Sequence, residues 1–416
     1  MPQKCILVTV NLDTRGPEFA FVKEAIEKRG LKPIIMDFSM EMEPPSPGGD
    51  ITCEEVAKAG GMSIEEVRYN YNKADRNKVT ENQITGGRKI AQQLFKEGKI
   101  HGAFGVGGGT STLISTSIMK ILPFGFPKLM ASPMAAHPRY IDKYVGTKDI
   151  TMHHTVLDIV GLNPLLKMQM MNAVGAICGM VEMSEGWGID KKEMPVVAVT
   201  GFGSAERAVE HAIGFLENLN YQPIVCHSQG VGDKAMDEMI ADGFFDGVID
   251  FVTGGISDEL FNGNCAGGPN RILAACRAKV PQVVCPGGLD KISYGGRSDL
   301  QERFSSRKMK ITDFTRVQVR TSPEECEQIA RVVAERLNEA VAPTIFLYPQ
   351  KGWSAMSEEG MHLYYPEAHE AFLREIKEHL KKEIKLVEVP LALNSREFAR
   401  KAVEMFDQLY KSLEKL

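Results

Sequence analysis

The sequence predicts an α/β protein whose two lobes carry mainly parallel sheets. Short apolar runs that suit strands buried on both faces alternate with segments of helical periodicity along the chain. Several of these runs end in glycine-rich turns, and their order repeats once. We therefore expect two Rossmann-like lobes related by internal duplication. The expected bounds are 1–186 for the N-terminal lobe, 187–194 for a linker and 195–416 for the C-terminal lobe.

The duplication is visible as a repeat at an offset of 190 residues, without a gap. The aligned pairs are Val199 with Thr9, Gly203 with Asp13, Ser204 with Thr14 and Pro223 with Pro33. Later in each lobe, the run 246–252 resembles 101–107, and the run 281–285 resembles 127–131. Two similar α/β lobes follow from this repeat.

Composition narrows the functional classes. The 416 residues are 43% hydrophobic and 25% charged, as in a globular protein large enough for two domains. A net charge of −5 and a pI near 6.1 argue against nucleic acid as the main partner. No apolar run approaches the ~20 residues of a membrane span, and the N-terminus lacks signal-peptide features, so we expect a cytoplasmic protein without a membrane partner. The eight cysteines form no C-x-x-C pair, which favours reduced thiols and no structural metal.

The chain begins with a predicted βαβ unit. A strand over 5–10 leads into a loop, Pro17 opens a helix, and a second strand follows over 32–37. The loop carries an acid, a hydroxyl and a base together, Asp13, Thr14 and Arg15. At the carboxyl end of a strand this set suits a ribose or phosphate contact, although Asp and Thr also serve as helix caps in surface turns.

A long loop and a long helix follow. Residues 40–61 are rich in proline and glycine, so we expect a functional loop in which Thr52 lines the same cleft. The helical pattern over 75–98 contains Gly86 and Gly87, which predicts a close approach to the helix backbone. Arg88 beside them is placed to reach a phosphate. Equally, the two glycines indicate a helix break next to a solvated arginine.

The stretch most indicative of function joins a strand over 102–106 to Gly107, Gly108 and Gly109, then Thr110, Ser111 and Thr112. A strand–glycine–helix junction presents backbone N–H groups and a helix dipole to an anion, with Thr110 or Ser111 as the expected N-cap. Glycines at such junctions also serve tight turns without a ligand. No lysine follows as in a P-loop, and G-x-G-x-x-G is incomplete, so the nucleotide class stays open.

A further turn joins the first-lobe candidates. A buried strand over 127–132 precedes the segment 144–154, in which Gly-Thr-Lys-Asp places Thr147 and Asp149 in one hydroxyl–cation–carboxylate turn. We interpret this turn as part of a nucleotide clamp. His153 and His154 are neighbours on a strand and point to opposite faces, so they do not form a metal pair.

The second lobe has glycine-rich strand ends of its own, which predict a second ligand site. Its candidate acid–base groups are Asp258, Glu259, Asp290 and Lys291, with helix capping as the alternative. The basic run over 303–310 suits an anionic substrate, a neighbouring subunit or a solvated face. The absence of G-x-S-x-G and H-E-x-x-H excludes the hydrolases and metalloproteases that carry these motifs.

Seven stretches together carry a resemblance that spans nearly the whole chain. They are 13–15, 107–110, 128–130, 146–152, 158–163, 351–355 and 365–368. In order and spacing the chain resembles a largely uncharacterised microbial family that is similar to the N-terminal ATP-binding domain of the tomato mosaic virus resistance protein. The block 146–163 is its most specific part. The chain departs from the expected pattern at Met356-Ser357 and at Tyr365, where we expect acids.

The resemblance implies ATP in the first lobe and a homodimer. The implied nucleotide contacts are Asp13, Thr14, Arg15, Arg88, Gly107, Gly108, Gly109 and Thr110. It implies no particular reaction, and no Mg²⁺ ligand can be named from a motif. Three functions stay open: an ATP-dependent enzyme acting on a small anionic metabolite, a nucleotide-binding regulatory or interaction protein without catalysis, and an enzyme acting on a sugar acid or phosphorylated metabolite from the second lobe.

Overall fold

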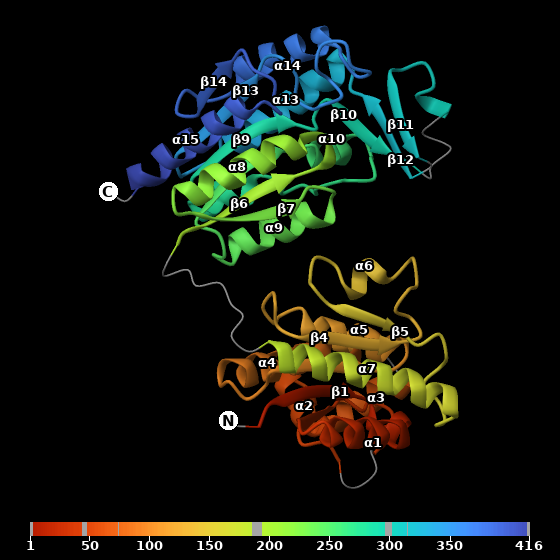
Figure 1. The fold of residues 1–416 in the computed structure, drawn as a ribbon. Coiled ribbons are helices and arrows are strands. Elements are labelled where there is room, and N and C mark those ends of the chain that lie inside the picture. The colour runs from red at the N-terminus through yellow and green to blue at the C-terminus, as the bar shows by residue number, and fades with distance from the viewer. Residues whose placement is uncertain are drawn as a thin grey trace. The chain divides into compact units, whose positions relative to one another are not determined.

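The computed structural model describes residues 3–43, 48–73, 75–184, 194–295, 302–313 and 315–413. The chain divides into two compact units, Met1–Ile189 and Asp190–Leu416, and each is described by itself. Residues 187–193 of the predicted linker lie outside the described residues. Both units place helices on a parallel sheet, which confirms the predicted fold class (Figure 1).

The first lobe is built on a five-stranded parallel sheet with the order β2-β1-β3-β4-β5. Its strands are β1 (Cys5–Val10), β2 (Lys32–Asp37), β3 (Gly102–Val106), β4 (Lys128–Ser132) and β5 (Thr151–His154). Its helices are α1 (Leu12–Lys28), α2 (Cys53–Gly60), α3 (Ile64–Lys73), α4 (Arg76–Lys96), α5 (Gly109–Met119), α6 (Ile141–Tyr144) and α7 (Pro164–Met183).

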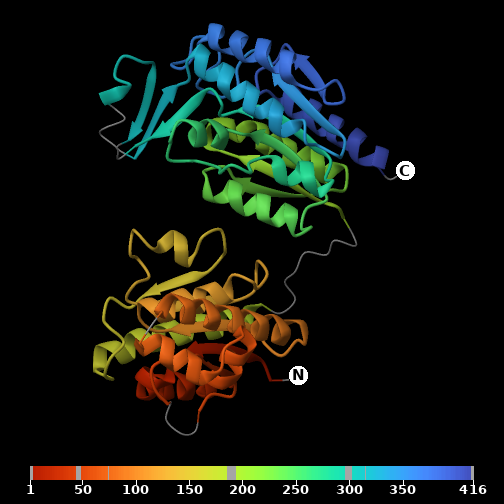
Figure 2. The ribbon, with the colours of Figure 1, turned by 180° about the vertical axis from the view of Figure 1, so that it is seen from behind.

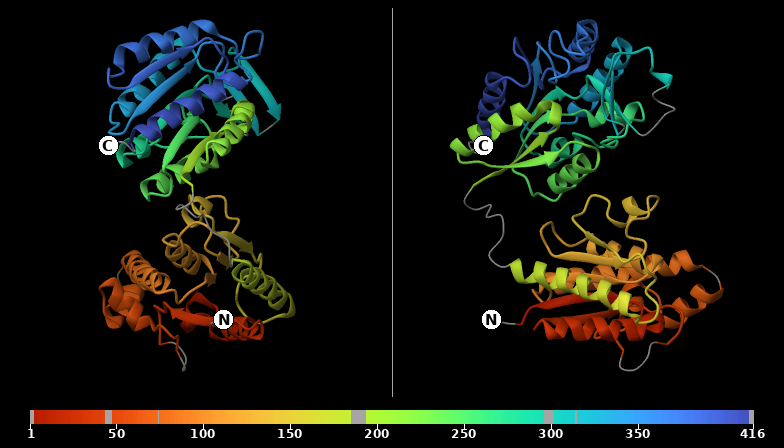
Figure 3. Two further views of the ribbon diagram at one scale, coloured as in Figure 1. Left: turned by 60° about the vertical axis from the view of Figure 1, so that its left-hand side comes forward. Right: turned by 45° about the vertical axis from the view of Figure 1, so that its right-hand side comes forward.

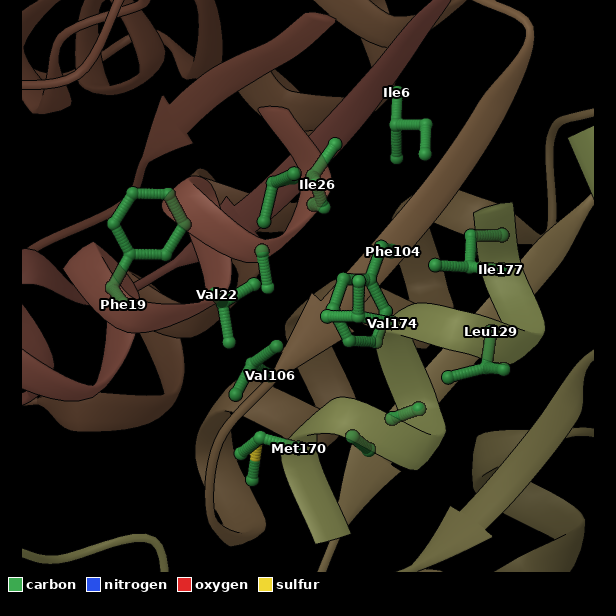
Figure 4. Close-up of a cluster of buried hydrophobic side chains, with 14 of the residues drawn as sticks. Ile6, Phe19, Val22, Ile26, Phe104, Val106, Leu129, Met170, Val174 and Ile177 are labelled. Carbon is green, nitrogen blue, oxygen red and sulfur yellow. The ribbon is translucent and has the colours of Figure 1, made fainter. Parts of the chain in front are cut away.

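Two apolar layers hold this lobe together. Helices α1 and α7 cover one face of the sheet, and α2 to α5 cover the other (Figure 3). Ile6 and Phe104 from the strands meet Ile26 of α1 and Val174 of α7 in the first layer (Figure 4). The central strands β1 and β3 are mainly apolar because both of their faces are buried, which is why continuous apolar runs identified them.

The second lobe is built on a six-stranded parallel sheet with the order β14-β13-β9-β8-β6-β7. Its strands are β6 (Val196–Gly201), β7 (Gln222–His227), β8 (Gly247–Val252), β9 (Gln282–Gly287), β13 (Thr344–Pro349) and β14 (Lys385–Val389). Its helices are η1 (Gly203–Ala205), α8 (Glu206–Asn218), α9 (Val231–Ala241), α10 (Gly255–Leu260), α11 (Leu273–Ala278), α13 (Pro323–Leu337), α14 (Pro366–His379) and α15 (Arg396–Leu413). A small antiparallel sheet of β10 (Lys291–Tyr294), β12 (Arg316–Arg320) and β11 (Met309–Asp313) is added to it (Figure 2).

Strand register confirms the duplication and corrects its alignment. The order β7-β6-β8-β9-β13 repeats β2-β1-β3-β4-β5. Thr9 lies opposite Met36, and Thr200 lies opposite Cys226 at the equivalent place in the second lobe. Cys226 follows Met36 by the offset of 190, but Thr200 follows Thr9 by 191, so the counterpart of Thr9 is Thr200 and not Val199. The gap-free alignment is wrong by one residue in β6, because the connection from β6 to β7 is one residue shorter than the connection from β1 to β2. Ser204, not Gly203, is the counterpart of Asp13.

Two predicted helix starts also change. Helix α5 begins at Gly109 with Gly108 as its N-cap, so neither Thr110 nor Ser111 is the cap. Helix α1 begins at Leu12 rather than at Pro17, and Arg15 interrupts it with φ −136° and ψ 26°. The predicted loop is thus one helical turn joined by a kink to the main helix.

Helix α4 runs without a break through both of its central glycines. A Cβ on Gly86 would lie 2.0 Å from the carbonyl oxygen of Val56 in α2, and a Cβ on Gly87 would lie 2.4 Å from Ile118 Cδ1 in α5. The predicted close approach is therefore confirmed, and the alternative of a helix break is wrong. The approaching groups are neighbouring helices.

All eight cysteines are free, as predicted. None of the helices in the described residues combines the length and the apolarity that a membrane span requires.

Candidate functional site

An open cleft of about 230 Å³ lies at the carboxyl edge of the first sheet. Its two main walls are the segments that follow the adjacent strands β1 and β3. The chain leaves β1 toward β2 on one side and β3 toward β4 on the other, so the strand order reverses here, which is where open α/β sheets bind ligands. The lining residues are Asn11, Asp13, Thr14, Arg15, Met40, Glu41, Tyr71, Gly108, Gly109, Thr110 and Ser111.

The N-terminus of α5 supplies hydrogen-bond donors to this cleft. The first helical bond runs from Thr112 N to Gly108 O at 2.8 Å, so the N–H groups of Gly109, Thr110 and Ser111 precede the helical ladder. Gly108 offers no side-chain cap. A Cβ on Gly108 would meet nothing within 4 Å, and one on Gly109 would meet only Met134 Cγ at 4.0 Å. This end of the helix therefore offers bare amides and a positive dipole to an anion.

Gly107 supports the turn rather than the cleft. Its φ is +151°, and a Cβ there would lie 2.4 Å from Ser111 Cβ. Its N–H donates to Ala131 O at 3.2 Å. Gly107 therefore allows the sharp step from β3 into α5 that exposes the next two glycines.

Asp13 stabilises one wall of the cleft through hydrogen bonds to the backbone. Its Oδ2 accepts hydrogen bonds from the backbone N–H groups of Met40 and Glu41 at 3.1 and 3.0 Å, while its buried Oδ1 has no hydrogen-bond partner among the described residues. Beneath it, the buried Asp37 accepts from Leu12 N and Ser39 N. Burial raises the pKa of Asp37. These two carboxyls hold the loop after β2 against the turn after β1.

Arg15, Glu41 and Tyr71 complete the lining of the cleft. Arg15 donates from Nη1 to the carbonyl of Thr14, so its guanidinium lies over the turn that it follows. The ring of Tyr71 has the guanidinium of Arg76 over it, 4.4 Å from the centroid. The strand order could have identified Glu41 as a lining residue, because Glu41 lies in the loop after β2 and β2 pairs with β1. Tyr71 on α3 carries no sequence signal for this site.

Two of the other predicted ligands lie outside this set of lining residues. Thr52 is the N-cap of α2, and its hydroxyl accepts from Glu55 N in a capping box. Arg88 donates from Nε to Ser117 O at 2.8 Å, near the last turn of α5 and therefore away from the glycine end of that helix. The cap and the helix contact account for both side chains.

Thr147 and Asp149 precede β5 and so lie at the amino edge of the sheet, opposite to the cleft. Asp149 pairs with the buried Lys128 at 2.7 Å and accepts from Gly125 N at 2.7 Å. Burial lowers the pKa of Lys128, although the carboxylate of Asp149 opposes this shift. The turn thus neutralises a buried lysine, and the structure does not bring it to the cleft.

The second lobe has a narrower crevice at the equivalent place, after β6 and β8. Its lining residues include Phe202, Gly254, Asp258, Gly288 and Lys291. Asp258 Oδ1 accepts from Cys265 N and Ser293 N, and burial raises the pKa of this carboxyl to about 7.

The other two predicted acids are Asp290 and Glu259, and Glu259 is partly exposed. Asp290 is buried and accepts from Ser354 Oγ at 2.5 Å. Glu259 accepts from Gly268 N at 3.1 Å. Helix capping does not account for the acid–base candidates, because the N-caps assigned to α10 and α13 are Gly254 and Ser322.

The basic run is partly neutralised. Arg307 pairs with Glu325, and Lys308 donates from Nζ to Tyr364 O at 2.6 Å. Both line a pocket that also contains the buried Arg320. Across the part of the chain that the structure describes, no group of three or more His, Cys, Asp or Glu side chains is arranged to hold a metal ion.

Comparison with known proteins places the chain in a family. Models of the uncharacterised protein family UPF0261 match residues 4–186 with its N-terminal domain and 194–410 with its C-terminal domain. A UPF0261 protein of Clostridium tetani is 36% identical and covers 99% of this chain and 100% of that protein. The tomato ToMV resistance protein Tm-1 is 31% identical over 74% of this chain and 42% of its own length.

Solved structures add little to this assignment. The structure described as PytH_H230A is similar over 54% of this chain and 99% of that chain, at 11% identity and with a TM-score of 0.30. The two family models together cover nearly the whole sequence. The chain belongs to the uncharacterised protein family UPF0261.

Proposed function

We propose that the first lobe binds ATP through its phosphates in the cleft between the turn after β1 and the start of α5. The observation that carries this proposal is the uncapped N-terminus of α5, which opens into a cleft at the point where the strand order reverses. Arg15 lies on the facing wall as the cation for a phosphate oxygen. The resemblance to a family that is similar to the ATP-binding domain of the tomato mosaic virus resistance protein supports the choice of nucleotide.

The size of the cleft is consistent with phosphate recognition. Its ~230 Å³ is below the ~300 to 1,000 Å³ of pockets that enclose a drug-sized ligand, so the cleft suits a triphosphate better than a whole nucleotide. Tyr71 at its margin offers an aromatic edge to the base. Mg²⁺ fits the same place, since it is commonly held by one or two carboxylates together with substrate phosphates, and Glu41 supplies a carboxylate here.

Calorimetric titration of ATP, ADP and inorganic phosphate, with and without Mg²⁺, tests this proposal. Arg15→Ala is expected to weaken ATP binding at least tenfold. Arg88→Ala is the matched control, because it removes a guanidinium of the same lobe that donates to the far end of α5. Loss of binding in the Arg88 variant but not in the Arg15 variant, or no heat with ATP, contradicts the proposed site.

ATP turnover separates an enzyme from a regulatory protein. An ATP-dependent enzyme of small-metabolite metabolism releases ADP only when its anionic substrate is present, whereas a regulatory or interaction protein binds ATP without release. Screening small carboxylates and phosphorylated metabolites for stimulated ADP release makes this distinction. Homodimer formation stays a prediction that sedimentation analysis tests.

A further inference from the structure

An open pocket of about 440 Å³ in the second lobe shares no lining residue with the narrow crevice after β6 and β8. Three segments line it: the turn before β11, the junction of β12 with α13, and the residue before α14. Its volume falls within the ~300 to 1,000 Å³ of pockets that hold small ligands. The lining residues are Ser306, Arg307, Lys308, Arg320, Ser322 and Tyr365.

The pocket lies on the side of the sheet where α/β proteins bind ligands. Helix α13 leads into β13, and α14 leads from β13 to β14, and these strands are parallel. Each helix therefore starts near the carboxyl edge of the sheet and returns the chain to the amino edge. The pocket is built at the starts of both helices, which is the ligand-binding edge of an open α/β sheet.

Backbone and ring contacts hold two cations close together. Arg320 N donates to Lys308 O at 2.9 Å, which joins two of the lining segments. The Nζ of Lys308 and the Cζ of Arg320 lie 5.2 and 5.8 Å from the centroid of the Tyr365 ring. The Nζ of Lys308 donates to Tyr364 O at 2.6 Å, and an ammonium has two further N–H donors. Both cations can therefore act on one anion beside the ring.

Arg320 is a buried cation that lacks an ion-pair partner. It is 2% exposed, its Nη1 donates to Asp290 O, and its Nη2 donates to Tyr365 O at 3.2 Å. Among the described residues, neither Arg320 nor Lys308 has a carboxylate oxygen at ion-pair distance. Burial opposes the shift, but the charges of Lys291 and Arg320 lower the pKa of the Asp290 carboxyl, so two cations share that carboxyl. An anion in the pocket would offset the cost of the buried guanidinium.

The third cation is already neutralised. Arg307 donates to both carboxylate oxygens of Glu325, at 2.9 and 2.5 Å. Glu325 also accepts from Ser322 N in the capping box of α13, so this helix end offers no free cap. Three cations thus line the pocket and one carboxylate offsets one of them, which leaves two positive charges. A phosphomonoester carries a charge of about −1.5 to −2 at pH 7, whereas a carboxylate carries a single negative charge.

From this geometry we propose that the pocket binds the phosphate group of a small phosphorylated metabolite. The ammonium of Lys308 and the hydroxyl of Ser306 donate to phosphate oxygens, and the buried charge of Arg320 stabilises the dianion. The ring of Tyr365 keeps the two cations in place. The rest of the volume accommodates the organic part of the metabolite. This site does not depend on ATP binding in the first lobe.

Calorimetric titration of glycerol 3-phosphate into the full chain tests the site, with glycerate as the three-carbon carboxylate for comparison. We expect glycerol 3-phosphate to bind at least tenfold more tightly than glycerate and to bind more weakly as salt is added. Lys308→Gln should weaken binding at least tenfold. Ser306→Asp should abolish binding, because it adds a carboxylate beside the cations. Both side chains are exposed, so both variants should fold, which circular dichroism checks.

Lys310→Gln is the matched control, because it removes the same charge from the same basic run at a residue that does not line the pocket. It should leave binding nearly unchanged. Arg15→Ala should also leave glycerol 3-phosphate binding unchanged, so the failure of the ATP site and the failure of this site can be told apart. No heat with glycerol 3-phosphate, equal affinity for glycerate, or full binding by a folded Ser306→Asp variant overturns the proposal. Binding that Arg15→Ala loses and Lys308→Gln keeps also overturns it.

Discussion

Replacing Gly86 with alanine tests how tightly α4 packs, because helix propensity and packing have opposite effects on stability at this position. Alanine favours a helix over glycine by about 1 kcal/mol. The new Cβ would lie 2.0 Å from the carbonyl oxygen of Val56, which is backbone and cannot rotate away. The helices must separate by about 1 Å, and overpacking of this kind costs about 3 kcal/mol. We therefore expect a net loss of about 2 kcal/mol.

Thermal unfolding of the full chain, followed by circular dichroism, measures this loss. For a lobe of this size, 2 kcal/mol corresponds to a fall in Tm of about 4 to 8 °C. Gly175→Ala is the matched control, since Gly175 lies within helix α7 of the same lobe and a Cβ there meets nothing within 4 Å. The control should raise Tm by about 2 to 4 °C. An equal rise in both variants refutes the packing argument.

Three further predictions follow from single contacts. Gly109→Ala should change stability by less than about 0.5 kcal/mol but weaken ATP binding about tenfold in calorimetry, because its methyl group has free space yet covers the phosphate approach. Asp149→Ala should destabilise the first lobe by about 2 kcal/mol and leave ATP affinity unchanged, because it leaves the buried Lys128 without its carboxylate. Breaking a fully buried ion pair costs ~3 to 5 kcal/mol, and the cost is smaller here because Asp149 is partly exposed. Burial raises the pKa of Asp258 to about 7, so its protonated carboxyl stabilises the fold below pH 4 and this contribution is lost as the pH rises to 7. Asp258→Asn should therefore flatten the dependence of Tm on pH between these two values.

Much of the fold follows from local patterns. Continuous apolar runs identified the inner parallel strands, since burial on both faces leaves no alternation, and the repeat of these runs indicated the duplication. The glycine-rich step from β3 into α5 and the Asp13–Arg15 turn come together at one edge of the sheet because parallel strands point the same way. The direction and order of the strands are therefore enough to predict that these two segments lie close together.

Contacts between distant segments decided the rest. Arg88 and Asp149 carry the right chemistry for a nucleotide, but helix direction places Arg88 near the end of α5, and strand direction places Asp149 at the amino edge of the sheet. In the second lobe, Lys291 donates from Nζ to the hydroxyl of Ser204, although 86 residues stand between them in the sequence. The sequence by itself determined the parallel strands, the duplication and the glycine-rich ends, because these depend on local burial and backbone freedom, but it did not predict the antiparallel sheet of β10, β11 and β12. Tertiary packing alone decided which charged and nucleophilic groups meet.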